Sequence, residues 1–184
     1  LIAMEELELF IPFQIVMYSN YSKRALKGYK GETMPSVGVC DRYYCVVHNV
    51  VEYFTFVDID DKTVFKRLVG IMNTHFQFKP FAIMESKYGY HVVIVTHNKN
   101  RRFYGKVHAL FKRYGIPYDD AHYKLRNRNG CVILRVFGKY VDDPYIRPVV
   151  VHNPGNDPVL SELLTFYEVR KWDIRSRSGY RMNI

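Results

Sequence analysis

The sequence predicts an α+β fold, in which helices pack on a sheet of antiparallel or mixed strands. Short apolar runs alternate with segments of helical periodicity, and between residues 51 and 137 they follow the order strand-helix-strand-strand-helix-strand. This order is that of a split βαβ, or RRM-like, unit. N-terminal strands precede this core and a C-terminal helix follows it.

The N-terminal third predicts strands and one basic loop. Residues 7–18 read as a strand with Pro12 at an edge or a bulge, and residues 20–34 as a basic loop or short helix. Residues 36–47 predict one or two strands, and their alternation fits a plain hairpin. This part leads directly into the core.

The central stretch begins with an aromatic strand, residues 51–60, and a helix follows at once. Asp60 or Asp61 can cap that helix, and Pro80 ends its pattern. Residues 81–85 and 91–96 are apolar runs suited to buried strands, joined by a turn in which Gly89 supplies a free backbone angle.

The second half of the chain predicts a helix over about residues 99–114 that ends at Gly115 and Pro117. Its expected buried positions are Phe103, Val107, Leu110, Phe111 and Tyr114. Strands are expected over residues 131–137 and, at a sheet edge, over residues 145–152. A last helix is expected from Asp157, as cap, and Pro158. A basic tail covers residues 170–184.

Composition favours one domain with an anionic partner. The chain has 184 residues, a formal charge of +9, 16 tyrosines and 12 phenylalanines. Basic charge beside flat aromatic side chains suits unstacked bases, so a nucleic acid is the expected macromolecular partner. No apolar run is long enough for a bilayer and residues 1–8 are acidic, so we expect a cytoplasmic protein with no membrane partner. The chain begins at Leu1, as a fragment of a longer protein would.

The three cysteines argue against a disulfide framework, because their number is odd and no secretory signal is present. Cys40, Cys45 and His48 are three potential zinc ligands. Their spacing is not a standard one and no fourth ligand is evident, so we favour a structural role for them.

Two carboxylates mark the end of the aromatic strand. Asp58 and Asp60 are two residues apart, so their side chains point to the same side of the sheet. Two carboxylates on one edge repel each other unless a cation lies between them, and oxygen ligands suit Mg²⁺ or Mn²⁺. Taken alone, Asp-x-Asp at a strand end more often only caps the next helix.

The carboxylate pair is followed by two further motifs, and together they resemble the archaeo-eukaryotic primase superfamily over residues 50–140. The matching segments are Asp58-Ile-Asp60, Ser86-Lys-Tyr-Gly89-Tyr-His91 and Leu134-Arg135-Val-Phe-Gly138-Lys139. The resemblance implies that Asp58 and Asp60 are catalytic and hold divalent metal. It also implies that His91 contacts the phosphates of an incoming nucleotide. Nucleotide-binding roles are further implied for Ser86, Lys87, Gly89, Arg135 and Lys139.

The chain departs from the family pattern in one respect. The family usually carries a third metal-binding acid near its third motif, and residues 124–130 contain no acid. The candidates for a substitute are Asp119, Asp120, Asp142 and Asp143. If none reaches the metal, we expect a chain that binds nucleotide or primer without efficient catalysis.

The sequence thus favours a metal-dependent primase or primase-polymerase of a plasmid, virus or archaeal replicon. Its substrates would be nucleoside triphosphates and a single-stranded DNA template, with a helicase domain or replication subunit as a further partner. The residues expected to bind the nucleic acid are Arg101, Arg102, Lys106, Arg126 and Arg128. The alternatives are a non-catalytic RRM-like binding module and a primase-derived accessory protein. The phosphate-binding P-loop of helicases and the His-hydrophobic-His pair of rolling-circle nickases are both missing from the sequence.

Overall fold

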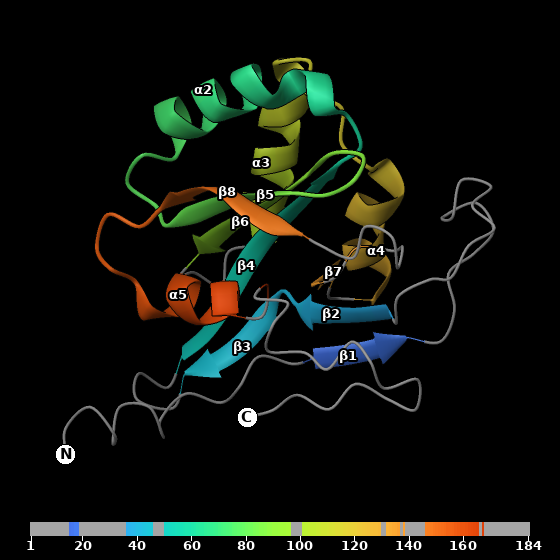
Figure 1. Cartoon of the computed structure of the whole chain (residues 1–184). Coiled ribbons are helices and arrows are strands. Elements are labelled where there is room, and N and C mark those ends of the chain that lie inside the picture. Colours follow the sequence, from blue (N-terminus) through green and yellow to red (C-terminus); the bar gives the residue numbers. More distant parts are fainter. Residues whose placement is uncertain are drawn as a thin grey trace.

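The computed structural model describes residues 15–18, 36–45, 50–96, 101–129, 132–136, 138, 146–165 and 167. These residues form an α+β structure with two antiparallel sheets (Figure 1). The strands are β1 (Ile15–Tyr18), β2 (Ser36–Cys40), β3 (Arg42–Cys45), β4 (Val50–Ile59), β5 (Phe81–Glu85), β6 (Tyr90–Thr96), β7 (Ile133–Arg135) and β8 (Arg147–His152). The helices are the 3₁₀ helix η1 (Lys62–Val64), α2 (Phe65–His75), α3 (Arg101–Arg113), α4 (Asp120–Asn129) and α5 (Pro158–Thr165).

The larger sheet has the strand order β3-β4-β6-β5-β8, and the smaller has the order β1-β2-β7. All neighbouring strands are antiparallel. Strands β5 and β6 form the predicted hairpin, and β6 lies between β5 and β4. Strand β4, which carries Asp58 and leads to Asp60, is therefore an interior strand of the larger sheet, beside the central strand β6, which begins with Tyr90 and His91.

Alternate residues of β4 face two different cores, as the pleat of a strand requires. Val57 and Ile59 pack with residues of α2 and α3 on one face of the larger sheet. Phe54 and Phe56 pack on the other face, against residues of α5 and the smaller sheet. Figure 1 shows these layers, with α2 and α3 on one side of the larger sheet and α5 and the smaller sheet on the other.

The helix boundaries follow the predicted caps. The Asp61 carboxylate accepts a hydrogen bond from the Thr63 N–H at 2.8 Å and begins η1, which leads into α2. The Asp157 carboxylate accepts from the Val159 N–H at 2.8 Å at the start of α5. Gly115, with φ of +69°, ends α3 as expected. Tyr114, predicted in the buried face of α3, is exposed instead, because its hydroxyl reaches His75 of α2 at 3.1 Å.

Residues 36–45 form two strands but no hairpin. Strand β2 joins the smaller sheet and β3 joins the larger one, and only Asp41 lies between them. Asp41 is fully buried, and its carboxylate accepts from the Arg126 Nε at 2.7 Å and the Val132 N–H at 3.2 Å. The chain changes sheets here because these bonds hold the connecting residue inside the fold.

The strand predicted at residues 131–137 also differs in its pairing. Strand β7 pairs with β2 in the smaller sheet, and β3 is the strand that lies beside β4. Helix α4 was not predicted, because its residues 120–129 are mostly polar and show no apolar stripe. The connection between β6 and β7 therefore contains two helices, α3 and α4.

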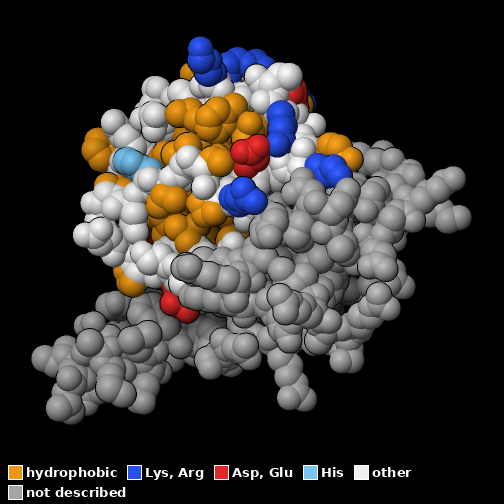
Figure 2. All heavy atoms as spheres, in the orientation of Figure 1, with side chains coloured by type: hydrophobic (Ala, Val, Ile, Leu, Met, Phe, Trp, Pro, Cys, Tyr) orange, Lys and Arg blue, Asp and Glu red, His pale blue; other side chains and the backbone are white. Residues whose placement is uncertain are grey.

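Strand β8 is at an edge of the larger sheet, as predicted, and pairs with β5. The exposed hydrophobic side chains of β8 are Val149 and Val151. Figure 2 shows hydrophobic side chains gathered on the face of the molecule that is seen in Figure 1. The predictions for residues 7–14, 20–34 and 170–184 lie outside the described residues.

Candidate functional site

The candidate site lies where β4 ends. Asp58 of β4 and His91 of β6 are cross-strand partners, and His91 is paired with Met84 of β5 on its other side. The Asp58 Oδ1 and the His91 Nε2 are 3.5 Å apart. The side chain of His91 is 1% exposed and that of Asp58 is 18% exposed, so the imidazole is buried behind a carboxylate that solvent can reach.

Backbone bonding explains why these two side chains come together. The Asp58 carbonyl accepts from the Asp119 N–H at 2.7 Å, on the side of β4 that faces away from β6. The N–H and C=O of one strand residue point to the same side, so Asp58 and His91 form a non-hydrogen-bonded pair. Such pairs bring the two Cα atoms and their side chains closest in an antiparallel sheet.

Asp60 and Asp61 have separate roles. Asp61 caps η1, and the hydrogen bonds from the Thr63 side chain and backbone lower the pKa of its carboxyl group. Asp60 is exposed and lies one residue beyond β4. The cap is therefore made by Asp61, and Asp58 and Asp60 remain as the two candidate metal ligands.

The turn between β5 and β6 packs directly on the end of β4. The Ser86 N–H donates to the Gly89 carbonyl at 2.9 Å and closes the turn. A Cβ atom at Gly89 would lie 1.7 Å from the Ile59 carbonyl oxygen and 2.9 Å from the Asp60 Cα. Gly89 is not among the residues with positive φ, so the predicted need for a free backbone angle at this position is wrong. It is needed because the turn approaches the β4 backbone too closely for any side chain.

Among the four candidates for a third acid, Asp119 lies beside Asp58 through the backbone bond described above. Its Oδ1 accepts from the His122 N–H at 3.1 Å, which places Asp119 at the start of α4. Asp120 instead pairs with Lys124 at 2.6 Å on the exposed side of α4. Asp142 and Asp143 lie outside the described residues.

Three of the five basic residues expected to bind nucleic acid have described side chains, and these three differ in exposure. Arg102 and Lys106 are exposed on α3. Arg126 is 8% exposed and is held by Asp41, with its guanidinium 4.6 Å from the centre of the Tyr104 ring. Arg126 is therefore a structural residue, which corrects the prediction. The side chains of Arg101 and Arg128 lie outside the described part of the structure.

The remaining predicted residues are more dispersed. Arg135 is on β7 in the smaller sheet and is half-buried, and Lys139 is outside the described residues. Cys40 is buried in β2, and its Sγ is 3.7 Å from the Asp41 Oδ1. Cys40 and Cys45 lie on strands of different sheets. Within the described ranges, no group of three or more His, Cys, Asp or Glu side chains is arranged to hold a metal ion.

The sequence did not predict an aromatic cluster between α3 and α4. The Tyr104 and Tyr123 rings stack with centroids 5.3 Å apart, and His108 lies 4.4 Å from Tyr123 and 4.8 Å from Tyr118. Burial lowers the pKa of His108 to about 4, although its Nδ1 lies 2.8 Å from the Tyr104 carbonyl oxygen. The cluster holds the segment that leads through Tyr118 to Asp119 and thus to Asp58.

Comparisons with protein-family models, with curated proteins and with solved structures found no match. No helix in the described part of the chain is long and apolar enough to cross a membrane. The functional argument therefore depends on the geometry of the site itself.

Proposed function

We propose that this chain is a metal-dependent nucleotidyltransferase of the primase or primase-polymerase kind, acting on single-stranded DNA. The observation that carries the proposal is the Asp58–His91 pair at 3.5 Å, with Asp60 two residues further along the chain and the Ser86–Gly89 turn packed against the end of β4. The two segments that contribute these residues, Asp58–Asp60 and Ser86–His91, are the first two motifs of the primase resemblance.

The strand arrangement supports the same proposal. Strands β4 and β5 are both antiparallel to β6, which lies between them, so β4 and β5 are parallel and α2 is the crossover that connects them. This arrangement supports a split βαβ unit as the core of the domain. The site is on the face of this unit opposite α2, where Asp58 shares the side of Phe54 and Phe56.

The residues fit a hard divalent cation. Asp58 and Asp60 supply oxygen donors, and Mg²⁺ is commonly bound through one or two carboxylates while waters and substrate phosphates complete its coordination. A bound ion would bring a 3′-hydroxyl and an α-phosphate together and neutralise the developing charge. Asp119 is the candidate for a third acid that is best supported, because its backbone is bonded to that of Asp58.

The other residues have supporting roles in this proposal. His91 is buried behind Asp58, so it would orient that carboxylate, in the way that second-shell groups hold metal ligands. Ser86 and Lys87 in the turn, with Arg135 and Lys139, would bind the triphosphate. Arg102 and Lys106 on the exposed side of α3 would attract the phosphates of the template.

A second candidate function is a non-catalytic nucleic-acid-binding module or a primase-derived replication accessory protein. Two observations favour it: within the described residues no three-ligand metal group is present, and His91 is buried. Under this alternative Asp58 and Asp60 contribute nothing to binding a single strand.

The test is nucleotide incorporation on a single-stranded template with Mn²⁺ or Mg²⁺, comparing Asp58→Asn and Asp60→Asn with the unaltered chain. Each substitution should abolish incorporation, and Asp120→Asn should not, because Asp120 is an exposed acid that pairs with Lys124. Strand affinity measured on the same proteins distinguishes the two functions. Full incorporation by both variants would exclude the metal site, and strand binding with no incorporation by any protein would favour the non-catalytic module.

A further inference from the structure

The β5–β6 turn carries an aromatic side chain at the end of the larger sheet. Tyr88 is 39% exposed, and it occupies a turn position where small or polar residues satisfy the backbone equally well. Most large apolar side chains of β4, β5 and β6 are instead buried in the two cores. More of the Tyr88 ring is therefore accessible to a ligand than of those side chains.

Tyr88 is held at a fixed place relative to the candidate site. It directly precedes Gly89, whose backbone packs on Ile59 and Asp60 so closely that no Cβ atom would fit. The Ser86 to Gly89 hydrogen bond of 2.9 Å closes the same turn. The backbone that carries Tyr88 is therefore fixed beside the end of β4 and Asp60.

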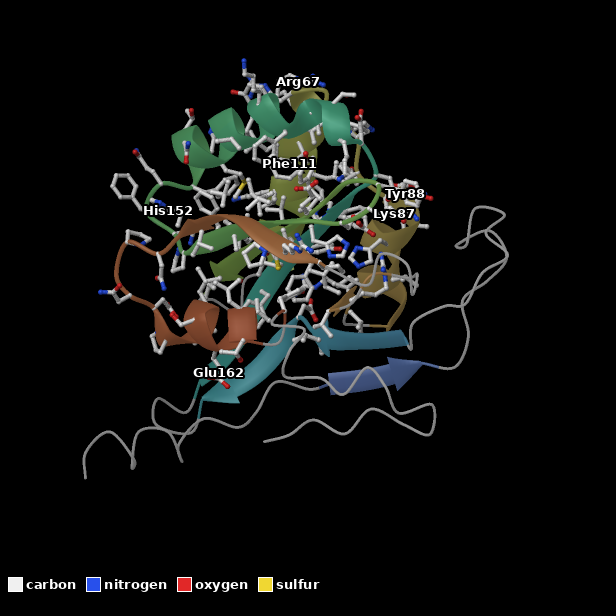
Figure 3. The ribbon with its side chains drawn as sticks, in the orientation of Figure 1. Arg67, Lys87, Tyr88, Phe111, His152 and Glu162 are labelled. Carbon is white, nitrogen blue, oxygen red and sulfur yellow. The ribbon has the colours of Figure 1, made fainter. Side chains whose placement is uncertain are left out.

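The ammonium group of Lys87 lies near the Tyr88 ring. The Lys87 Nζ lies 5.8 Å from the centre of the Tyr88 ring, within the range of a cation–π contact. Figure 3 shows the two side chains together at the end of the sheet. An aromatic face beside an ammonium group matches the two parts of a nucleotide, since the base stacks on a ring and the phosphate attracts a cation.

We propose that Tyr88 is a stacking platform for a nucleobase and that Lys87 binds the phosphate of the same nucleotide. The proposal deepens the function proposed above and relies on it for the position of the nucleotide. The base could belong to an incoming nucleoside triphosphate or to the single strand, and the recognising chemistry is the same. A stacked base beside Asp60 would lie near the carboxylates that are proposed to hold the metal.

The experiment compares ligands with and without a base, using binding alone. Tyr88→Ala is measured against ATP and inorganic tripolyphosphate, and against an oligothymidylate strand and an abasic strand of equal length. Base stacking is lost in this variant, so affinity for one or both of the base-containing ligands should fall about 5- to 100-fold. Affinity for tripolyphosphate and for the abasic strand should stay within about twofold. The pair that responds identifies the source of the base.

Two further variants make the result specific. Tyr88→Trp should restore the affinity, because any aromatic ring can stack. Phe78→Ala should change nothing, because Phe78 is 87% exposed but follows α2 at the opposite end of β5. An equal loss for ligands with and without bases, or no loss at all, would overturn the proposal. These binding measurements require neither metal nor nucleotide incorporation. Failure of the stacking proposal can therefore be distinguished from failure of the proposed function.

Discussion

The imidazole of His91 and the carboxylate of Asp58 face each other across β4 and β6 at 3.5 Å, and the imidazole is the buried member of the pair. The primase resemblance implies that His91 contacts phosphate. Because only 1% of the His91 side chain is exposed, its ring can act on a bound nucleotide more directly through Asp58 than through its own atoms. The geometry therefore suggests that His91 orients the carboxylate, and that Asp58 faces the substrate.

His91→Ala tests this relationship. Loss of a group that orients a metal ligand typically costs about 10- to 100-fold in metal affinity, so we expect a loss of this size for Mn²⁺. Nucleotide affinity in the presence of Mn²⁺ should fall with it, while affinity for single-stranded DNA should change little. His75→Ala is the control, because His75 is an exposed histidine on α2. Equal losses of metal affinity, strand affinity and thermal stability would indicate a histidine with only a packing role.

Gly89→Ala tests the contact between the turn and β4. The added Cβ atom would lie 1.7 Å from the Ile59 carbonyl oxygen, so the turn or the strand must shift. Overpacking of this kind costs about 1–3 kcal/mol, and we expect at least that loss in the free energy of unfolding. Gly70→Ala is the matched control, because nothing lies within 4 Å of its Cβ position in α2. Alanine favours a helix by about 1 kcal/mol over glycine, so the control should be neutral or stabilising in chemical denaturation.

The sequence predicted those features that short segments determine. The β5–β6 hairpin and the Asp157 cap each depend on a few neighbouring residues, and the structure has both. Asp41 shows why other features could not be predicted. Its environment is set by Arg126, which is 85 residues away, and no local pattern indicates that the chain changes sheets there. Helix α4 was missed for the same reason, since its place depends on tertiary contacts and not on an apolar stripe.

The buried Asp41–Arg126 pair predicts a large effect on stability. Asp41→Ala removes the carboxylate that holds the guanidinium and the Val132 N–H, and leaves an uncompensated buried charge. Breaking a buried pair in this way costs about 3–5 kcal/mol, and urea denaturation should show a loss of this size. Lys124→Ala, on the same helix, breaks an exposed pair with Asp120 and should cost less than about 1 kcal/mol. Similar losses in the two variants would mean that the Asp41–Arg126 pair contributes no more than a surface contact.

The cluster around His108 predicts how stability depends on pH. Burial among the rings of Tyr104, Tyr118 and Tyr123 lowers the pKa of His108 from 6.5 to about 4. The nearby His122 and Arg126 act in the same direction, and the hydrogen bond to the Tyr104 carbonyl opposes them.

Because this pKa is lower in the folded chain, the unfolded chain binds a proton first as the pH falls. The contribution of His108 to the free energy of unfolding is therefore lost between about pH 6.5 and pH 4, by about 3 kcal/mol in total. His108→Phe keeps a ring in the cluster and removes the titrating group. In this window the unfolding free energy of the variant should change less with pH than that of the unaltered chain. The difference in slope should correspond to at most one bound proton. If the slope is unchanged, His108 takes up its proton over the same pH range in the folded and the unfolded chain. The cluster would then accept a charged imidazole.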